Sequence, residues 1–309
     1  MIDATGRSAS LSLVLVTHNG WQYTAACLAQ VFAQSFAAPL EVIVVDNASS
    51  DDTPENIRKA FPQVKLIESA ANLGFGAACN LGLQDAAGDF YVLLNNDALV
   101  DAGQLEALVQ AYQRHGLNGI YTARIVDADG AEEASCFRQI TPADLLIDTF
   151  MLMSTALARH SYALAQRDEE ALDIAACSGA FCLFPRALWQ QTGGFDERFF
   201  MYYEDMDLCQ RARTLGYGVY VNTRITLLHK GGGSAPGNVW RARIVDASQR
   251  QFYHKHYGTW GLFAARLHQV LRSTPRAIIH GLFALNARHR ELSSMHARLA
   301  LDALMGARP

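Results

Sequence analysis

The chain has 309 residues, of which 50% are hydrophobic and 18% are charged, and this balance excludes an intrinsically disordered protein. Its formal net charge of −4 gives no basis for nucleic-acid binding. Because no apolar run approaches the roughly 20 residues that span a bilayer, and Met1–Ser10 lacks the apolar core of a signal peptide, we expect a cytoplasmic protein that is soluble or peripheral at the inner face of the cell membrane.

Strands and helices alternate through the first part of the chain. Continuous apolar runs, which are typical of strands buried on both faces, occur at Leu11–Thr17, Glu41–Asp46, Val64–Glu68 and Phe90–Leu94. Helices are expected between and after them, at Tyr23–Gln34, from Thr53-Pro54 onward, at Gly74–Leu83 and at Gln104–His115. This alternation predicts parallel βαβ units and therefore an α/β fold with a Rossmann-like, mostly parallel sheet flanked by helices.

Polar residues follow three of these strands where each strand ends. They are Thr17–Asn19, Asp46-Asn47 and Asn95–Asp97. The carboxyl ends of parallel strands share one edge of the sheet, and ligands of such sheets bind at that edge. The convergence therefore predicts a ligand site there.

Two of these clusters suit a nucleotide. A carboxylate at the end of a buried strand is costly unless it is paired, so Asp46 either accepts the N3–H of a pyrimidine ring or caps the turn that follows it. Asn95, Asn96 and Asp97 offer hard oxygen ligands of the kind that Mg²⁺ and Mn²⁺ prefer, and such a cation neutralises a diphosphate. The same three residues also fit an ordinary turn.

The regularity weakens after Val126. A hairpin turn is expected at Asp127–Gly130, residues 131–173 are irregular, and the apolar stretch Ile174–Phe184 predicts one strand. The remaining expected elements are a short helix at Arg186–Gln191, a helix at Tyr203–Leu215, strands at Val219–Val221 and Ile225–Leu228, and helices from Val239 onward. The second half thus adds short strands and helices to the alternating first half.

The second half also supplies an acidic cluster and a histidine. Glu204, Asp205 and Asp207 place three carboxylates within four positions, where mutual repulsion raises a pKa and makes a member a competent base. The same acids suit a helix N-terminus, whose dipole favours negative charge. His229 follows an apolar strand, where a neutral imidazole either completes a metal site or is a structural histidine.

Together these segments resemble the family-2 inverting glycosyltransferases, especially their rhamnosyltransferase-like branch. The matching stretches are LVLVTHN (Leu13–Asn19), VVDNASSDDT (Val44–Thr53), NLGFGAACNLGL (Asn72–Leu83), YVLLNNDA (Tyr91–Ala98), SGAFCLFPR (Ser178–Arg186), GGFDERFFMYYEDMDLCQRARTLGY (Gly193–Tyr217) and LLHKGGGS (Leu227–Ser234). The resemblance implies a GT-A fold for residues 1–240, with a nucleotide-binding half at about 11–126 and an acceptor and catalytic half at about 127–240.

The resemblance also assigns roles to single residues. The nucleotide sugar would be bound by Thr17, Asn19, Asp46, Asn72, Gly74 and Asn96. Asp97 and His229 would bind the Mg²⁺ or Mn²⁺ cofactor, although the motif reads NND and so has one carboxylate instead of two. Asp205 would be the catalytic base, with Glu204 beside it.

The implied reaction is a metal-dependent, inverting single displacement. A sugar would pass from a nucleotide-diphosphate donor, dTDP-rhamnose or a UDP-sugar, to a hydroxyl of a glycan or lipid-linked glycan in surface polysaccharide or cell-wall synthesis. One alternative is a nucleotidyltransferase, but that class usually carries a glycine-rich phosphate loop with a basic residue where this chain has THNGW. The other alternative is a non-catalytic nucleotide-sugar-binding protein on the same fold, and the retained acids and histidine argue against it.

Residues 241–309 form a basic extension that we expect to be helical. This segment has 11 Lys and Arg against 3 Asp and Glu, with Leu262, Phe263, Leu267, Val270 and Leu271 at helical spacing beside Arg266 and Arg272. Such a segment either attaches to an anionic membrane surface, joins two subunits in a homodimer, or packs as an ordinary core.

Overall fold

The computed structural model describes residues 9–101, 103–150, 161–230, 238–283 and 286–305. They fall into two compact units, which are described separately. The sheet unit lies within residues 1–138, 161–200 and 204–234, and the helical unit lies within residues 139–160, 201–203 and 235–309.

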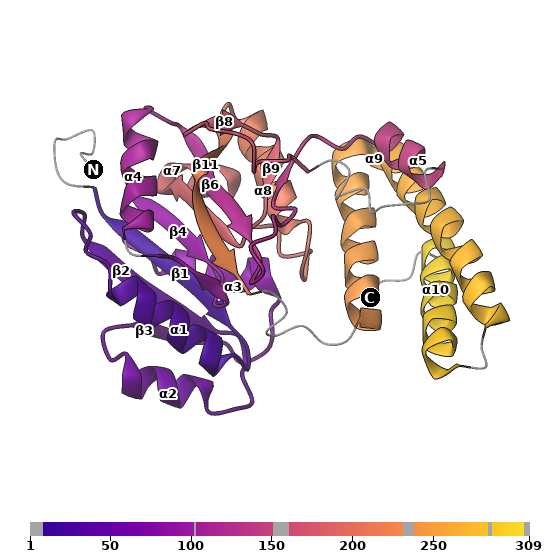
Figure 1. Cartoon of the computed structure of the whole chain (residues 1–309), viewed down its shortest axis with the longest axis horizontal. Coiled ribbons are helices and arrows are strands. Elements are labelled where there is room, and N and C mark those ends of the chain that lie inside the picture. The colour runs from indigo at the N-terminus through magenta and orange to yellow at the C-terminus, as the bar shows by residue number, and fades with distance from the viewer. Residues whose placement is uncertain (1–8, 102, 151–160, 231–237, 284–285, 306–309) are drawn as a thin grey trace. The chain divides into compact units, whose positions relative to one another are not determined.

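The sheet unit is built on one mixed sheet in the order β3-β2-β1-β4-β10-β6-β11-β5, with β8 paired to β11 (Figure 1). The strands are β1 (Leu11–Thr17), β2 (Leu40–Asp46), β3 (Lys65–Glu68), β4 (Phe90–Leu94), β5 (Ala98–Leu99), β6 (Gly119–Val126), β8 (Leu172–Asp173), β10 (Phe181–Pro185) and β11 (Gly218–His229). Strands β1 to β4 are parallel to one another, and β10 runs antiparallel between β4 and β6. Because β6 is parallel to β11, the strands β1, β2, β4, β6 and β11 all end at one edge of the sheet. We call this the carboxyl edge.

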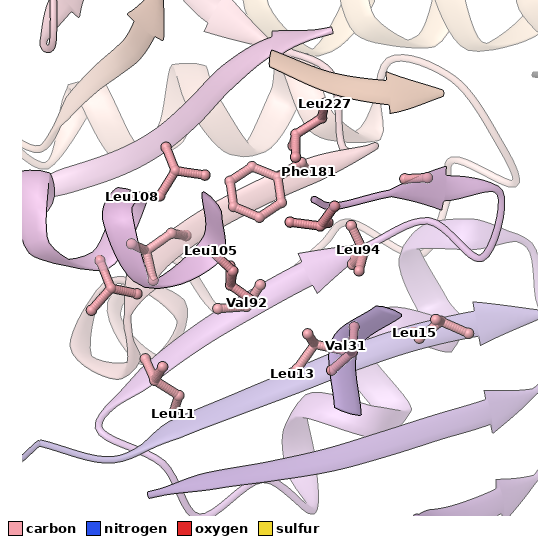
Figure 2. Packing of buried hydrophobic residues seen from close by; sticks show 14 of the residues in the cluster. Leu11, Leu13, Leu15, Val31, Val92, Leu94, Leu105, Leu108, Phe181 and Leu227 are labelled. Atoms are coloured by element: carbon pink, nitrogen blue, oxygen red, sulfur yellow. The ribbon is translucent and has the colours of Figure 1, made fainter. Parts of the chain in front are cut away.

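Helices pack on both faces of the sheet, because side chains of a strand alternate between its faces. The helices are α1 (Trp21–Phe32), α2 (Thr53–Ala60), α3 (Phe75–Gln84), α4 (Gln104–Arg114), α7 (Arg186–Thr192) and α8 (Glu204–Thr214). Leu13 and Leu15 of β1 belong to the core cluster with Val31 of α1 and Leu105 of α4 (Figure 2). Val14 points to the other face, where it meets Gly82 of α3. The predicted α/β fold with its mostly parallel sheet is therefore confirmed.

The stretch Ile174–Phe184, which the sequence predicts as one strand, is interrupted. Its first part holds β9 (Ala176–Cys177), which pairs with β7 (Cys136–Phe137) in a separate two-stranded ladder, and its last part belongs to β10. Residues 178–180 turn between them. A Cβ on Gly179 would lie 2.9 Å from the ring of Phe75, so the turn brings the backbone close to the start of α3. The single strand was a wrong prediction because small residues within an apolar run permit such a turn.

Two further segments differ from expectation. The strands predicted at Val219–Val221 and Ile225–Leu228 are parts of one strand, β11, whose pairing with β6 shifts register between Asn222 and Thr226. The segment 131–173, expected to be irregular, contains α5 (Pro142–Phe150). The hairpin turn predicted at Asp127–Gly130 is confirmed, since the Asp127 N–H donates to the carbonyl of Ala131 at 2.9 Å.

The helical unit consists of α5, α9 (Asn238–Leu282) and α10 (Ala287–Met305), which confirms the helical C-terminal extension. Gly258 interrupts α9 with φ of 62°, a backbone conformation that glycine adopts at little cost. Arg243 of α9 forms an ion pair with Asp302 of α10 at 3.1 Å, and Asp246 pairs with Arg250 at 3.2 Å. None of the helices that the structure describes is both long and apolar enough to cross a membrane.

Candidate active site

Hydroxyl and amide side chains join the ends of β1 and β4 at the carboxyl edge. Thr17, the last residue of β1, is buried, and its Oγ1 lies 2.8 Å from Oγ1 of Thr24 in α1. The amide Nδ2 of Asn96 donates to Thr17 at 3.2 Å and to Thr24 at 3.3 Å. Asn96 is therefore held by the start of α1, and two predicted residues from distant parts of the sequence are in direct contact.

Asp46 is buried at the end of β2, and its two carboxylate oxygens differ. Oδ2 accepts the backbone N–H of Ser49 at 3.0 Å, which is the turn-capping role considered above. Oδ1 is buried and has no hydrogen-bond partner within the described residues. An unpaired buried carboxylate oxygen is costly, so both roles foreseen for Asp46 are compatible: one oxygen caps the turn and the other is left for a ligand donor.

The loops after β1 and β2 hold each other. Asn19 accepts the Ser50 N–H with its Oδ1 at 2.7 Å and donates its own N–H to Ser49 Oγ at 2.8 Å. Asn19 has φ of 51° and Ala48 has φ of 60°, a left-handed conformation that is uncommon outside glycine. Asn19 thus contacts the turn that Asp46 caps, instead of Asp46 itself.

Asn47, which the sequence analysis did not single out as a site residue, organises the next part of the edge. Its Nδ2 donates to Asn72 Oδ1 at 3.1 Å and to the carbonyl of Gly74 at 3.2 Å, and its Oδ1 accepts the N–H of Leu73 at 2.8 Å. Gly74 has φ of 83° and ψ of 179°, and a Cβ there would lie 2.0 Å from the carbonyl oxygen of Phe200. Only glycine fits at that position, so Asn72 and Gly74 are fixed against both β2 and the segment before α8.

His229 lies between two carboxylates at the end of β11. Its Nε2 is 3.1 Å from Asp97 Oδ1, and its Nδ1 is 3.0 Å from Glu133 Oε2. Burial disfavours the charged imidazole, but the hydrogen bonds and charges of Asp97 and Glu133 outweigh it and raise the pKa of His229 to about 9. The strand pair β5–β11 sets this contact, since His229 pairs with Ala98, the residue after Asp97.

Asp97 and His229 fit as one side of a divalent cation site. Asp97 Oδ1 and His229 Nε2 lie 3.1 Å apart as an ion pair, and two ligands at right angles on a small divalent ion would lie about 3.0 Å apart. A cation bound there would displace the proton that the raised pKa of about 9 keeps on His229. Asn95 Nδ2 lies 3.4 Å from the same Nε2. Across the parts of the chain that are described, no three or more His, Cys, Asp and Glu side chains are arranged to hold a metal. A cation here would therefore need further oxygens from its ligand, which a diphosphate has.

The three acids at the start of α8 occupy three environments. Asp207 is fully buried and accepts a hydrogen bond from Arg211 Nε at 2.8 Å. Glu204 is buried with an unpaired Oε2. Asp205 is half-buried and accepts the N–H of Gly179 at 2.9 Å and that of Met206 at 2.7 Å. Only Asp205 combines hydrogen-bonded oxygens with access to solvent.

These environments separate the pKa values of Glu204 and Asp205. Burial, together with the charge of Asp205, raises the pKa of Glu204 well above its usual range. Burial also raises the pKa of Asp205, but the amides of Gly179 and Met206 stabilise its charged form and counteract this. Burial therefore favours the neutral form of Glu204 more strongly, whereas the backbone amides favour the charged form of Asp205, which suits Asp205 to accept a proton.

Backbone strain is concentrated around these residues. Among the residues described, the non-glycine positions with positive φ are Asn19, Ala48, Tyr202 and Tyr203. The first two lie in the loops after β1 and β2, and the last two directly precede Glu204 at φ of 67° and 69°. Such conformations persist only where the surroundings enforce them and are typical of functional sites.

The structure brings most of the predicted site residues to the carboxyl edge. Thr17 and Asn96 touch, Asn72 and Gly74 share a turn, and Asp97 and His229 pair, while Asp205 reaches the same edge through Gly179 at the start of β10. Sequence reasoning placed Asn47 in a polar cluster without giving it a role, and it missed Gly179 and Glu133. Asn47 lies within a matching motif and could have been chosen from it, whereas Glu133 lies in the irregular segment and has no sequence signal.

Comparisons with known proteins agree on the type of protein. The model of the family described as "Glycosyl transferase family 2" matches residues 12–192. The chain is similar to the N-acetylglucosaminyl-diphospho-decaprenol L-rhamnosyltransferase of Mycobacterium tuberculosis, at 30% identity over 292 residues that cover 86% of this chain and 94% of that protein.

Two solved structures show the same fold. One is the mannosyltransferase PcManGT from Pyrobaculum calidifontis in complex with GDP-Man and Mn²⁺, with a TM-score of 0.58 and 19% identity over 98% of this chain and 89% of that chain. The other is S. aureus TarS 1–349 in complex with UDP, with a TM-score of 0.52 and 16% identity over 96% of this chain and 92% of that chain.

Proposed function

The chain belongs to glycosyl transferase family 2, and from that premise we propose that it transfers a rhamnosyl group from dTDP-rhamnose to a lipid-linked glycan. The family and the fold make it a nucleotide-sugar glycosyltransferase. The finer proposal is supported by the similarity to a rhamnosyltransferase named for a diphospho-decaprenol acceptor. A UDP-sugar is the alternative donor.

The observation that carries the proposal is the meeting of three kinds of chemistry at one edge of the sheet. An unpaired carboxylate oxygen of Asp46 is available for a nucleobase N–H, Asp97 and His229 lie 3.1 Å apart where a cation would bind, and Asp205 is a hydrogen-bonded, accessible carboxylate. A nucleotide-sugar transferase needs all three, because it must hold a nucleoside, neutralise a diphosphate and activate a hydroxyl.

Asp205 acts as the base of a single displacement. It accepts the proton of the acceptor hydroxyl, whose oxygen bonds to the anomeric carbon while the bond from that carbon to the diphosphate breaks. The attack comes from the face opposite the diphosphate, so the configuration at this carbon inverts. Burial and the charge of Asp205 raise the pKa of Glu204, which favours its neutral form and so limits the negative charge near the attacking oxygen.

Residues of the carboxyl edge hold the donor. The pocket proposed for the nucleotide sugar is lined by Thr17, Asn19, Asp46, Asn72, Gly74 and Asn96. Asp97 and His229 would hold Mg²⁺ or Mn²⁺, which supplies positive charge to the departing diphosphate when bound. A structure of the same fold holds GDP-Man and Mn²⁺, which are a donor and an ion of the proposed kinds.

The proposed functions fall on consecutive segments of the chain. Residues 11–126 supply the nucleotide side, residues 127–240 supply the base and the acceptor side, and residues 241–309 form the basic extension. Since the acceptor is lipid-linked and the donor is a nucleotide sugar, the reaction is placed at the cytoplasmic face of the cell membrane.

A screen of nucleotide sugars by thermal shift, with and without Mn²⁺, tests the donor side of this proposal. A ligand that binds only the folded state stabilises it by about 2.7 kcal/mol at a concentration 100 times its Kd. We expect a raised melting temperature with dTDP-rhamnose or a UDP-sugar that increases further with Mn²⁺. No shift with any nucleotide sugar would contradict the proposal.

A further inference from the structure

An exposed apolar stripe runs along the second half of α9. Its members are Trp260, Phe263, Leu271, Ile278 and Leu282, and their exposed fractions range from 40% for Leu271 to 77% for Leu282. At 3.6 residues per turn, these five positions fall within an arc of about 100° around the helix axis. We call them the apolar stripe. Soluble surfaces rarely keep so many large apolar side chains on one face of a helix, so the stripe needs a partner.

The opposite side of this helix already has a partner within the helical unit. Ala265, Gln269 and Ser273 are buried there. Beside them, His268 Nδ1 lies 2.9 Å from Thr149 Oγ1 of α5. The stripe is thus the face that remains after α9 has packed in its own unit. Leu267 and Val270, which the sequence analysis grouped with the stripe, are only partly exposed.

The surroundings of the stripe are basic. No Asp or Glu occurs between Asp246 and Glu291, whereas seven Lys and Arg do. The ion pairs Asp246–Arg250 and Asp302–Arg243 each combine one acid with one base inside the helical unit. Residues 241–309 therefore retain nine other Lys and Arg against Glu291. Arg288 and Arg298 of α10 are exposed. A binding partner therefore meets an apolar surface within a positive field.

An apolar stripe on a basic unit favours an anionic lipid surface over a second copy of the chain as its partner. A second copy of the chain would bring one strongly basic unit against another, and like charges oppose that contact. An anionic lipid surface offers negative headgroups to the arginines and an acyl boundary to Trp260 and Phe263, whose side chains favour that depth. Because no described helix can cross a bilayer, α9 would lie in the interface.

We propose that the apolar stripe of α9 docks the protein on anionic membrane lipids, which the net positive charge of the helical unit attracts. This inference rests on the helical unit alone and holds whether or not the transferase assignment is correct. Attachment of this kind confines the protein to the plane that holds lipid-linked molecules.

Vesicle co-sedimentation of the full chain tests the proposal. Vesicles of phosphatidylcholine alone and vesicles that also contain about 30% phosphatidylglycerol, an anionic lipid, are compared at low and high salt. We expect binding to the anionic vesicles that weakens by roughly tenfold or more at high salt, because salt screens the headgroup charge. Ile278→Ser with Leu282→Ser should weaken binding by a similar factor, because both side chains are exposed and lose their apolar contact.

Leu215→Ser is the matched control, since Leu215 is 49% exposed and belongs to the sheet unit. It should leave vesicle binding unchanged, and far-UV circular dichroism should show that all variants keep their helices. Arg288→Glu with Arg298→Glu should reduce binding to anionic vesicles while neutral vesicles remain unbound. The proposal is overturned if binding ignores lipid charge, if the stripe variant binds as wild type does, or if the stripe variant instead converts a dimer into a monomer in sedimentation velocity without any vesicle binding.

Discussion

Two neighbouring carboxyl groups, Glu204 and Asp205, differ in what surrounds them, and the roles that we propose for them rest on that difference. Asp205 is hydrogen-bonded by Gly179 and Met206, whereas Glu204 is buried with an unpaired oxygen. The residue pattern places both acids in one cluster, and only the family resemblance separates them by giving Asp205 as the base. The physical cause of the separation is the turn at Gly179, whose contact with Asp205 comes from a distant part of the chain and cannot be deduced from the cluster itself.

Asp205→Asn should therefore abolish transfer while donor affinity stays within a few-fold of wild type. A positioned base supplies roughly 10²–10⁴ in rate, so we expect turnover to fall by at least that factor. Glu204→Gln is the matched control, because burial favours the neutral form of Glu204 and an amide is neutral too, and we expect it to retain most activity. Initial rates and donor calorimetry are measured for both variants. A strong loss of activity confined to Glu204→Gln would identify Glu204 as the base instead of Asp205.

Asp97→Ala should weaken donor binding mainly when metal is present. The reason is that Asp97 carries the only carboxylate of the NND motif and lies 3.1 Å from His229. We expect a loss of roughly tenfold or more with Mn²⁺ and a small loss without it. Titration calorimetry under both conditions is the measurement, with exposed Asp101→Ala as control. Equal losses under both conditions would mean that Asp97 supports the sugar or the fold instead of the cation.

Elements of the first half could be predicted closely because their sequence signals are local. Leu11–Thr17 and Phe90–Leu94 are strands with the predicted bounds, since a continuous apolar run needs a buried position on both faces. The second half was harder because its strands depend on distant partners. β10 lies antiparallel between β4 and β6, and nothing in its own residues shows this.

Gly74 is the point where one element most constrains another. Gly74→Ala would place a Cβ 2.0 Å from the Phe200 carbonyl oxygen, so the segment before α8 must move. Gly103→Ala is the matched control, because Gly103 has a similar φ of 80° with nothing within 4 Å of the added atom. We expect the control to lose about 1 kcal/mol of unfolding free energy from left-handed strain.

Gly74→Ala should lose at least about 2 kcal/mol more than the control, because the clash adds to the strain. It should also weaken donor binding, since Gly74 is tied to Asn47 at the carboxyl edge. Urea denaturation of both variants measures the difference. Equal stability losses would show that the contact with Phe200 does not constrain the site.

At the scale of the whole molecule, the stability of the helical unit should depend on pH through His268. His268 is buried in the helical unit, where burial and the charge of Arg272 lower its pKa to about 4. The hydrogen bond to the Leu145 carbonyl and the charge of Asp148 raise this pKa but are outweighed. In the unfolded chain a histidine has a pKa of about 6.5. The unfolded state therefore binds more protons between pH 6.5 and 4, and stability falls as pH is lowered through this range.

The slope from His268 alone reaches about 1.4 kcal/mol per pH unit. Burial raises the pKa of Asp246 in the same unit to about 6, which gives a slope of opposite sign, so the comparison must be made between variants. His268→Asn should remove the destabilising slope, and exposed His254→Gln of the same helix should leave it in place. Denaturation at several pH values is the measurement, and an unchanged slope in His268→Asn would contradict the buried, neutral histidine.

The measurement that tests the central claim most directly is transfer of labelled sugar to lipid. Wild type and Asp205→Asn are incubated with labelled dTDP-rhamnose, Mn²⁺ and a polyprenyl-diphosphate-linked N-acetylglucosamine, and label in the organic phase is counted. The claim predicts label in the lipid for wild type, a loss of at least about 10² for the variant, and an anomeric configuration by NMR opposite to that of the donor. Wild-type transfer that survives in Asp205→Asn, or a product that keeps the donor's configuration, would contradict it.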